Sequence, residues 1–175
     1  SYVSKLRHLG IEACSDQIIL STDGAIRYLK DHMHDHIYIL GTEALKEEMA
    51  LQGIVHSESQ PSLILVGYDT ELTYEKLKKT CEWIHSGVSY IATHPDLVCP
   101  SEKGDIPDIG ITIEILRQTT GQAPLKVFGK PNAEMLNFIL QHKNLDSDDI
   151  LIVGDRLYTD YELSRKVKSD FIAVL

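Results

Sequence analysis

Short apolar runs alternate with segments in which apolar residues recur every three or four positions, and this pattern continues along almost the whole chain. A short, β-branched apolar run is typical of a buried strand, whereas the three-to-four spacing predicts a helix with one core-facing stripe. Strands are predicted at 17–20, 37–40, 63–66, 88–92, 125–128, 150–153 and 171–175. Such alternation of strands and helices favours an α/β fold with a largely parallel sheet.

Several of the predicted helices have a hydroxyl residue where the helix should begin. Ser21 or Thr22, Thr42 and Thr73 are the expected N-caps, since their side-chain oxygens can accept a hydrogen bond from the first turn. Helices are predicted at 1–10, 22–31, 43–52, 74–85 and 109–119, with two more after Pro131 and before the last strand. The stretch 95–107, which contains three prolines and a glycine, is predicted to be a loop. The chain opens within a helical pattern and closes directly after a strand, so both ends are expected to continue in a larger protein.

The segment that follows the predicted strand 150–153 carries two acids. Asp155 comes directly after Gly154, and Asp160 follows five positions later. Parallel strands present ligand-binding groups just beyond their carboxyl ends, and paired carboxylates there suit a hard cation such as Mg²⁺. The simpler interpretation is that Asp155 is a turn residue and Asp160 only an acid at the start of a helix.

A lysine follows the preceding predicted strand in the same way. Lys130 stands between Gly129 and Pro131, and Pro131 is expected at the first position of a helix, where its missing N–H costs nothing. A lysine at a strand tip beside a helix N-terminus can neutralise a phosphate or a carboxylate. Taken alone it could be a solvated loop lysine, but one cationic and one acidic tip on successive strands favour a shared site.

Charge and composition narrow the class of protein. The formal net charge of −9 argues against a nucleic-acid surface, which needs a basic face. No apolar run approaches membrane-spanning length and no signal peptide opens the sequence, so no membrane partner is expected. Cys14, Cys81 and Cys99 are widely spaced and form no C-x-x-C, which is typical of reduced thiols in a cytoplasmic protein.

Two polar segments need separate treatment. Thr93, His94 and Asp96 follow the predicted strand 88–92 and again place polar groups at a strand tip, although proline and aspartate also favour a simple turn. The tract from His32 to His36 has histidines at alternate positions, which do not converge unless the chain is extended there. A solvated polar loop is therefore expected rather than a metal site.

With these residues in view, the chain resembles the haloacid dehalogenase superfamily, in particular the large-cap branch of p-nitrophenylphosphatase-like and sugar-phosphate phosphatases. The resemblance covers essentially the whole chain. Its carriers are Gly129-Lys130-Pro131, the stretch from Gly154-Asp155 to Thr159-Asp160, and the segments Gly67-Tyr68-Asp69 and Thr93-His94-Pro95-Asp96.

The resemblance implies a fold, a reaction and roles for these residues. It implies a Rossmann-like hydrolase core formed by 1–35 and 110–175, with an inserted α/β cap at 36–109. The implied reaction is Mg²⁺-dependent hydrolysis of a small phosphorylated metabolite through an aspartyl phosphate. Asp155 takes the place of the metal ligand, Lys130 binds the phosphate and the nucleophile, and Asp160 is a supporting acid. Thr93, His94 and Asp96 are expected to face the substrate from the cap, and a homodimer through the cap is implied.

The sequence also departs from the branch. The nucleophile of the family is the first acid of a D-x-D motif at the end of an apolar strand, and no such strand occurs here, so the nucleophile is expected upstream of residue 1. His94 stands where the branch has asparagine, and Ile106 to Gly110 replaces a more glycine-rich turn. A non-catalytic protein that binds phosphate esters, or an inactive fragment, is the alternative. A phospho-accepting receiver domain fits poorly because its acids precede its lysine.

Overall fold

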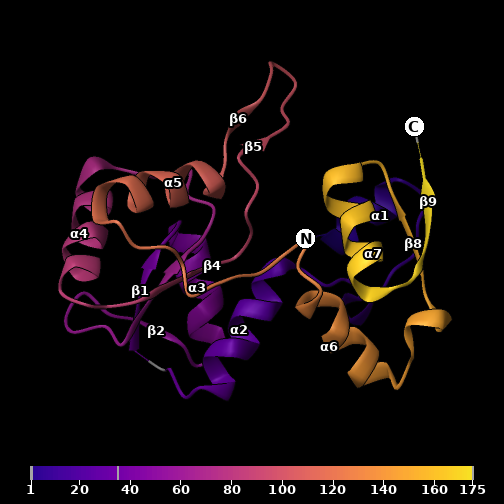
Figure 1. Ribbon diagram of the computed structural model, residues 1–175, viewed down its shortest axis with the longest axis horizontal. Helices are drawn as coiled ribbons and strands as arrows, with labels where there is room; N and C mark the ends of the chain where they lie inside the picture. Colours follow the sequence, from indigo (N-terminus) through magenta and orange to yellow (C-terminus); the bar gives the residue numbers. More distant parts are fainter. Residues whose placement is uncertain (1, 35, 175) are drawn as a thin grey trace.

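The computed structural model describes residues 2–34 and 36–174, so Ser1 of the predicted first helix, Asp35 of the histidine tract and Leu175 of the last strand lie outside it. Its larger part is a five-stranded parallel sheet of order β2-β1-β3-β4-β7 (Figure 1). The strands are β1 His36–Leu40, β2 Val55–His56, β3 Leu63–Val66, β4 Tyr90–Ala92 and β7 Lys126–Val127. The predicted α/β class with a parallel sheet is confirmed.

Helices cover both faces of this sheet, as Figure 1 shows. Successive side chains of a strand point to opposite faces. Ile37 and Ile39 therefore pack with α2 (Ser21–Asp31) and α3 (Glu43–Leu51). Tyr38 and Leu40 face the other side and pack with α4 (Tyr74–His85) and α5 (Ile109–Thr120). This double burial explains why the strands are continuous apolar runs rather than alternating ones.

The N-caps of α3 and α4 are confirmed, and that of α2 is wrong. Thr42 Oγ1 accepts a hydrogen bond from Leu45 N at 3.2 Å, and Thr73 accepts one from Lys76 N at 3.3 Å. At α2 the cap position is Leu20, whose N–H donates to Asp23 Oδ2 at 2.7 Å. The acid in the first turn thus binds the N–H of the N-cap residue, which differs from the bond that a hydroxyl at the N-cap would make with the first turn.

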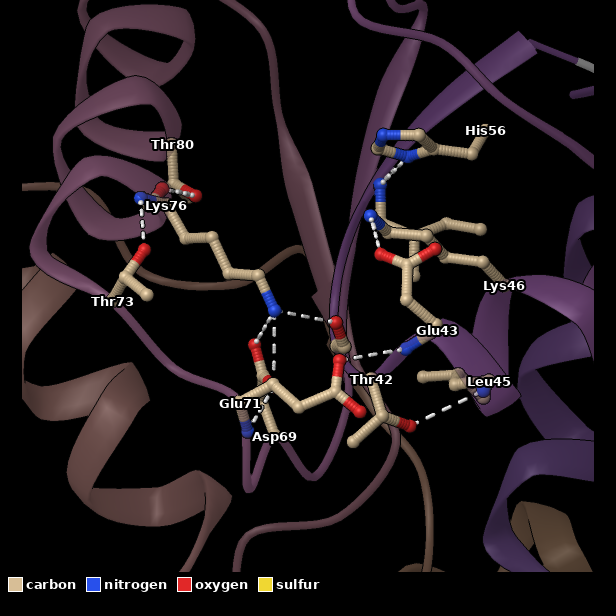
Figure 2. Close-up of polar contacts among 12 residues, drawn as sticks. Thr42, Glu43, Leu45, Lys46, His56, Asp69, Glu71, Thr73, Lys76 and Thr80 are labelled. Carbon is tan, nitrogen blue, oxygen red and sulfur yellow. Dashed lines mark hydrogen bonds and ion pairs between the residues drawn. The ribbon is translucent and has the colours of Figure 1, made fainter.

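A largely buried ion pair joins α4 to the loop after β3 at the carboxyl edge of the sheet (Figure 2). Lys76 Nζ lies 2.9 Å from Asp69 Oδ2 and donates to the carbonyl of Gly41 at 3.1 Å. The Asp69 side chain is only 4% exposed. Beside it, Glu43 N donates to Glu71 Oε2 at 3.1 Å. These contacts hold the loop after β3 against the loop after β1.

The predicted loop 95–107 is wrong in part, because it contains a hairpin. Strands β5 (Val98–Cys99) and β6 (Ile106–Pro107) pair antiparallel and project from the sheet (Figure 1). Each strand has only two residues and lies close to prolines in the sequence. Such a strand is too short to show the periodic pattern of apolar residues that predicts strands. The hairpin brings Leu97 and Val98 to the solvent, where they are 58% and 42% exposed.

The remaining residues form a second, smaller sheet with its helices. Strands β8 (Leu151–Gly154) and β9 (Asp170–Ala173) pair in parallel. The associated helices are α1 (Tyr2–His8), α6 (Glu134–Lys143) and α7 (Glu162–Val167). The strand predicted at 17–20 is wrong, since Ser15–Gln17 is a short 3-10 helix and the apolar residues after it are half-buried without strand pairing. Among the described residues, no helix has both the length and the apolar character that crossing a bilayer requires.

The five-stranded sheet extends beyond the boundaries expected for the cap. Strand β7 lies after residue 109 and is part of the sheet, and α2, which precedes residue 36, packs on it. The packing therefore favours a unit that runs from α2 to β7. The division at 36 and 109 stays a prediction.

Candidate active site

The predicted lysine and acid meet at the boundary between the two sheets. Lys130 Nζ lies 2.6 Å from Asp160 Oδ1. The Asp160 side chain is 6% exposed, whereas that of Lys130 is 46% exposed. The carboxylate is thus buried behind the lysine, and the ammonium group keeps an open side on which an anion can be bound.

Asp160 is fixed by the turn that follows β8. Residues Leu157–Tyr161 form a short π-helical turn, and the N–H of Arg156 donates to Asp160 Oδ2 at 3.2 Å. Gly154 makes room for the carboxylate, because a Cβ at that position would lie 2.5 Å from the Asp160 side chain. A glycine at the end of β8 is therefore needed for the packing of Asp160.

Lys130 is positioned by the end of β7 and the loop after it. Gly129 has a φ of +75°, and a Cβ there would meet Ser21 and His94, so the chain turns tightly past the tip of β4. The expectation that Pro131 begins a helix is wrong. Helix α6 begins at Glu134, and Asn132 instead ties the loop back by donating from Nδ2 to the carbonyl of Val127 at 2.7 Å.

Asp155 is placed differently from Asp160. It is exposed at the tip of β8, and within residues 2–34 and 36–174 its carboxylate has no hydrogen-bond or ion-pair partner. An exposed carboxylate free of protein partners, at the carboxyl end of a parallel strand, fits a hard divalent cation that needs oxygen ligands. Asp155 is the residue that would hold Mg²⁺ from this part of the chain.

A cleft of about 350 Å³ separates the hairpin base from the turn after β8. Its walls combine apolar groups with one carboxylate, one guanidinium and two hydroxyl-bearing side chains. The lining residues are Pro95, Asp96, Leu97, Val98, Pro131, Arg156, Tyr158 and Thr159. Since Pro131 adjoins Lys130 and Thr159 adjoins Asp160, the cleft opens beside the lysine–acid pair. Arg156 and Tyr158 had not been expected to line a site, because nothing in the sequence distinguishes them from other loop residues.

The polar segment after β4 is partly turned away from this cleft. His94 Nε2 lies 2.9 Å from Asp108 Oδ1, and His94 Nδ1 lies 3.2 Å from Thr93 Oγ1. Thr93 is only 2% exposed. Of the three residues expected to face a substrate from this side, Asp96 is the one that lines the cleft. Asp108, which caps α5 through its contact with Ile109 N at 2.7 Å, had not been singled out in the sequence.

Two histidines of the tract make separate local contacts. His32 Nδ1 is 2.8 Å from the carbonyl of Tyr28, and His34 Nδ1 is 3.0 Å from Ser62 Oγ. The solvated polar loop stays a prediction.

Comparison with known proteins gives this geometry its family. Residues 127–175 match a model of HAD-like hydrolases, and residues 1–55 match a model of haloacid dehalogenase-like hydrolases. The crystal structure of 4-nitrophenylphosphatase from Thermotoga maritima is 37% identical, with a TM-score of 0.94 over 99% of this chain and 67% of that one. The chain belongs to the haloacid dehalogenase superfamily.

Other relatives of this haloacid dehalogenase-type chain are named for phosphatase activity. An acid sugar phosphatase of Staphylococcus haemolyticus is 30% identical over 172 residues, which are 97% of this chain and 65% of that protein. A glycerol phosphate phosphatase of Mycobacterium tuberculosis, solved in complex with calcium, is 27% identical with a TM-score of 0.88. It is aligned over 99% of this chain and 52% of its own. The chain therefore spans slightly less than two thirds of the length of the sugar phosphatase.

Proposed function

We propose that this chain is the larger part of a Mg²⁺-dependent phosphatase that hydrolyses a small phosphate monoester such as a sugar phosphate. The single observation that carries the proposal is the Lys130–Asp160 pair at 2.6 Å, together with Asp155, which is exposed at the start of the same turn and has no partner among the described residues. A lysine and a carboxylate that is free to bind a metal ion suit a phosphoryl group, whose oxygens carry the negative charge. The phosphatase names of the relatives support the same reaction.

The nucleophile in this proposal is an aspartate that precedes residue 1 in the intact protein. The D-x-D spelling does occur at Asp146-Ser147-Asp148, but those residues lie around a 3-10 helix and not at the end of an apolar strand. Strands β8 and β9 also expose apolar side chains, with Val153 at 56% and Ile172 at 49%. Such a two-stranded parallel sheet is expected to be covered and extended by further chain.

The proposed reaction proceeds in two displacements. The aspartate carboxylate attacks phosphorus, the ester P–O bond breaks and the alcohol leaves, which gives an aspartyl phosphate. Water then attacks phosphorus, and inorganic phosphate and the free carboxylate are released. Lys130 binds the phosphoryl oxygens as a positive point charge, and Asp160 keeps its ammonium group in place. Mg²⁺ bound at Asp155 would supply further positive charge, which would offset the negative charge of the phosphoryl oxygens.

The cleft supports a small leaving group. Its volume of about 350 Å³ is near the lower end of ordinary ligand pockets. Asp96 is the polar group that the sheet side contributes to it, and we propose that Asp96 contacts the leaving group. Thr93 acts only through His94, because its side chain is buried against that ring. Dimerisation through the cap stays a prediction.

The proposal is tested first by the intact mass and N-terminal sequence of the purified protein, followed by a phosphate-release screen. We expect additional residues that include a D-x-D after an apolar run. We also expect phosphate release from one or more sugar phosphates with Mg²⁺, and none after chelation with EDTA. Measurable binding of phosphate esters without any release would instead favour the non-catalytic alternative.

A further inference from the structure

A cluster of metal-ligating side chains lies on the sheet side of the cleft, and of its members Asp96 alone has been assigned a contact with the proposed leaving group. It consists of His94 and Asp96 after β4 and Asp108 before α5. One ligand atom from each residue can be chosen so that all three lie within 4.8 Å of one another. Three groups at that spacing could converge on a single metal ion.

Among the described residues, His94 is the one group that can balance the charge of an acid in this cluster, through its contact with Asp108 at 2.9 Å. The Asp108 side chain is 8% exposed, and its Oδ1 accepts hydrogen bonds from His94 and from the N–H of Ile109. Its Oδ2 and both oxygens of Asp96 have no partner among the described residues. In the same part of the chain, neither acid forms an ion pair with a lysine or arginine. Two neighbouring carboxylates, one of them buried, are unfavourable unless a cation joins them.

Backbone contacts hold the two ligand-bearing segments together. Gly110 N donates to the carbonyl of Asp96 at 2.7 Å, and Asp108 N donates to the carbonyl of Leu97 at 3.0 Å. A Cβ at Gly110 would lie 2.5 Å from the carbonyl oxygen of Pro95, so only glycine permits this approach. The ligands are therefore held in place before any ion arrives, and less ordering is needed on binding.

We propose that His94, Asp96 and Asp108 bind a divalent transition-metal ion, with Zn²⁺ as the preferred occupant. An imidazole nitrogen with two carboxylates suits Zn²⁺ rather than Mg²⁺ or Ca²⁺, which take oxygen ligands alone. His94 would coordinate the ion through Nε2. Its Nδ1, which lies 3.2 Å from Thr93 Oγ1, would donate a hydrogen bond to that hydroxyl, and this bond would orient the ring.

Three protein ligands leave one position of a tetrahedral ion for water or for a ligand oxygen. Because Asp96 also lines the cleft, the ion would border the space where the proposed leaving group lies. The metal site does not depend on the phosphatase reaction, since none of its three ligands belongs to the Lys130–Asp160 pair.

The test is calorimetric titration of Zn²⁺ alone into the intact protein carrying Asp155→Asn, which removes the expected Mg²⁺ ligand. We expect one bound Zn²⁺ per chain and a loss of affinity of about tenfold or more for Asp96→Asn and for His94→Asn. The matched controls are Asp105→Asn and His85→Asn, which change exposed residues outside the cluster and should leave the affinity unchanged.

Asp96→Asn is the decisive variant, because the Asp96 side chain makes no contact with the described residues that the substitution would break, and circular dichroism checks that the variant folds. Binding of Co²⁺ in place of Zn²⁺ should give a visible absorption that His94→Asn abolishes. Absence of Zn²⁺ binding, or equal affinity in Asp96→Asn and its parent, would overturn the proposed metal site. Phosphate release with Mg²⁺ by the protein that retains Asp155 is measured separately, so failure of one proposal is distinguishable from failure of the other.

Discussion

Lys130 and Asp160 are 30 residues apart in the chain, yet Lys130 Nζ lies 2.6 Å from Asp160 Oδ1. The lysine follows β7 of the large sheet and the acid follows β8 of the small one, so the pair links the two parts of the molecule. The acid is buried and the lysine is half exposed. This asymmetry leaves the ammonium group available to an anion while the carboxylate keeps it in place.

Lys130→Met should remove the positive charge that the proposed reaction needs at the phosphoryl group. We expect kcat/KM for phosphate release to fall by about 10²–10³, as for the loss of one stabilising electrostatic group in other active sites. Steady-state kinetics on the intact protein measure the effect. Lys166→Met, an exposed change on α7, is the control and should keep the wild-type rate. A rate within twofold of wild type for Lys130→Met would exclude Lys130 from the reaction.

Lys76→Met should destabilise the large sheet without touching the proposed active site. The substitution leaves the Asp69 carboxylate buried without its cation, which costs about 3–5 kcal/mol of unfolding free energy for a buried pair. Lys78→Met is the matched control, because Lys78 is 52% exposed and its pairing with Glu75 spans 3.8 Å. Urea unfolding compares the two variants. Equal losses of stability would contradict a structural role for the Lys76–Asp69 pair.

Alkaline pH should weaken the fold through two buried tyrosines. Burial raises the pKa of Tyr90 and that of Tyr38 to about 12 in each case. The unfolded chain loses these protons near the ordinary tyrosine pKa of about 10, before the folded chain does. The contribution of the two tyrosines to the unfolding free energy is therefore fully present below pH 10. It is lost as the pH rises towards 12, by up to about 2–3 kcal/mol for each tyrosine.

Unfolding free energies at pH 8, 10 and 11 measure this loss. Tyr90→Phe should show a shallower decline between pH 10 and 11, although it also loses the hydrogen bond from Tyr90 to the carbonyl of Gln122 at 3.1 Å. Tyr74→Phe, at a 77% exposed position, should decline like the wild type. Equal slopes for Tyr90→Phe and wild type would show that Tyr90 does not contribute.

The elements that the sequence predicts best are those in which local pattern and burial agree. Strand β3 is a continuous apolar run because helices cover both of its faces. Thr42 is the N-cap of α3, as its residue type indicates. The three apolar residues at 18–20 have the same local pattern but no strand beside them, so they form none. Pro131 fits the first turn of a helix by residue type, but α6 begins at Glu134 after the loop has been tied to β7.

In the candidate active site, too, the features that depend on local pattern were predictable and those that depend on distant parts of the chain were not. Lys130 and Asp160 were predictable because both follow apolar strands, whose tips carry functional groups in α/β proteins. The pairing of His94 with Asp108 was not predictable, because the two residues are 14 positions apart and it depends on how the segment between them returns to the tip of β4. Hairpin β5–β6 makes that return, and its two-residue strands carry no periodic signal.

The most direct test of the central claim is the initial rate of phosphate release by the intact protein with saturating Mg²⁺, measured for wild type and Asp155→Asn. Asp155 is exposed and unpaired among the described residues, so the substitution should leave thermal stability unchanged. We expect a loss of about 10²-fold or more, because the metal would lose its ligand from this chain. Asp148→Asn, which changes another exposed acid at the opposite end of β8, should keep the full rate. Equal rates for Asp155→Asn and wild type would contradict the proposed active site.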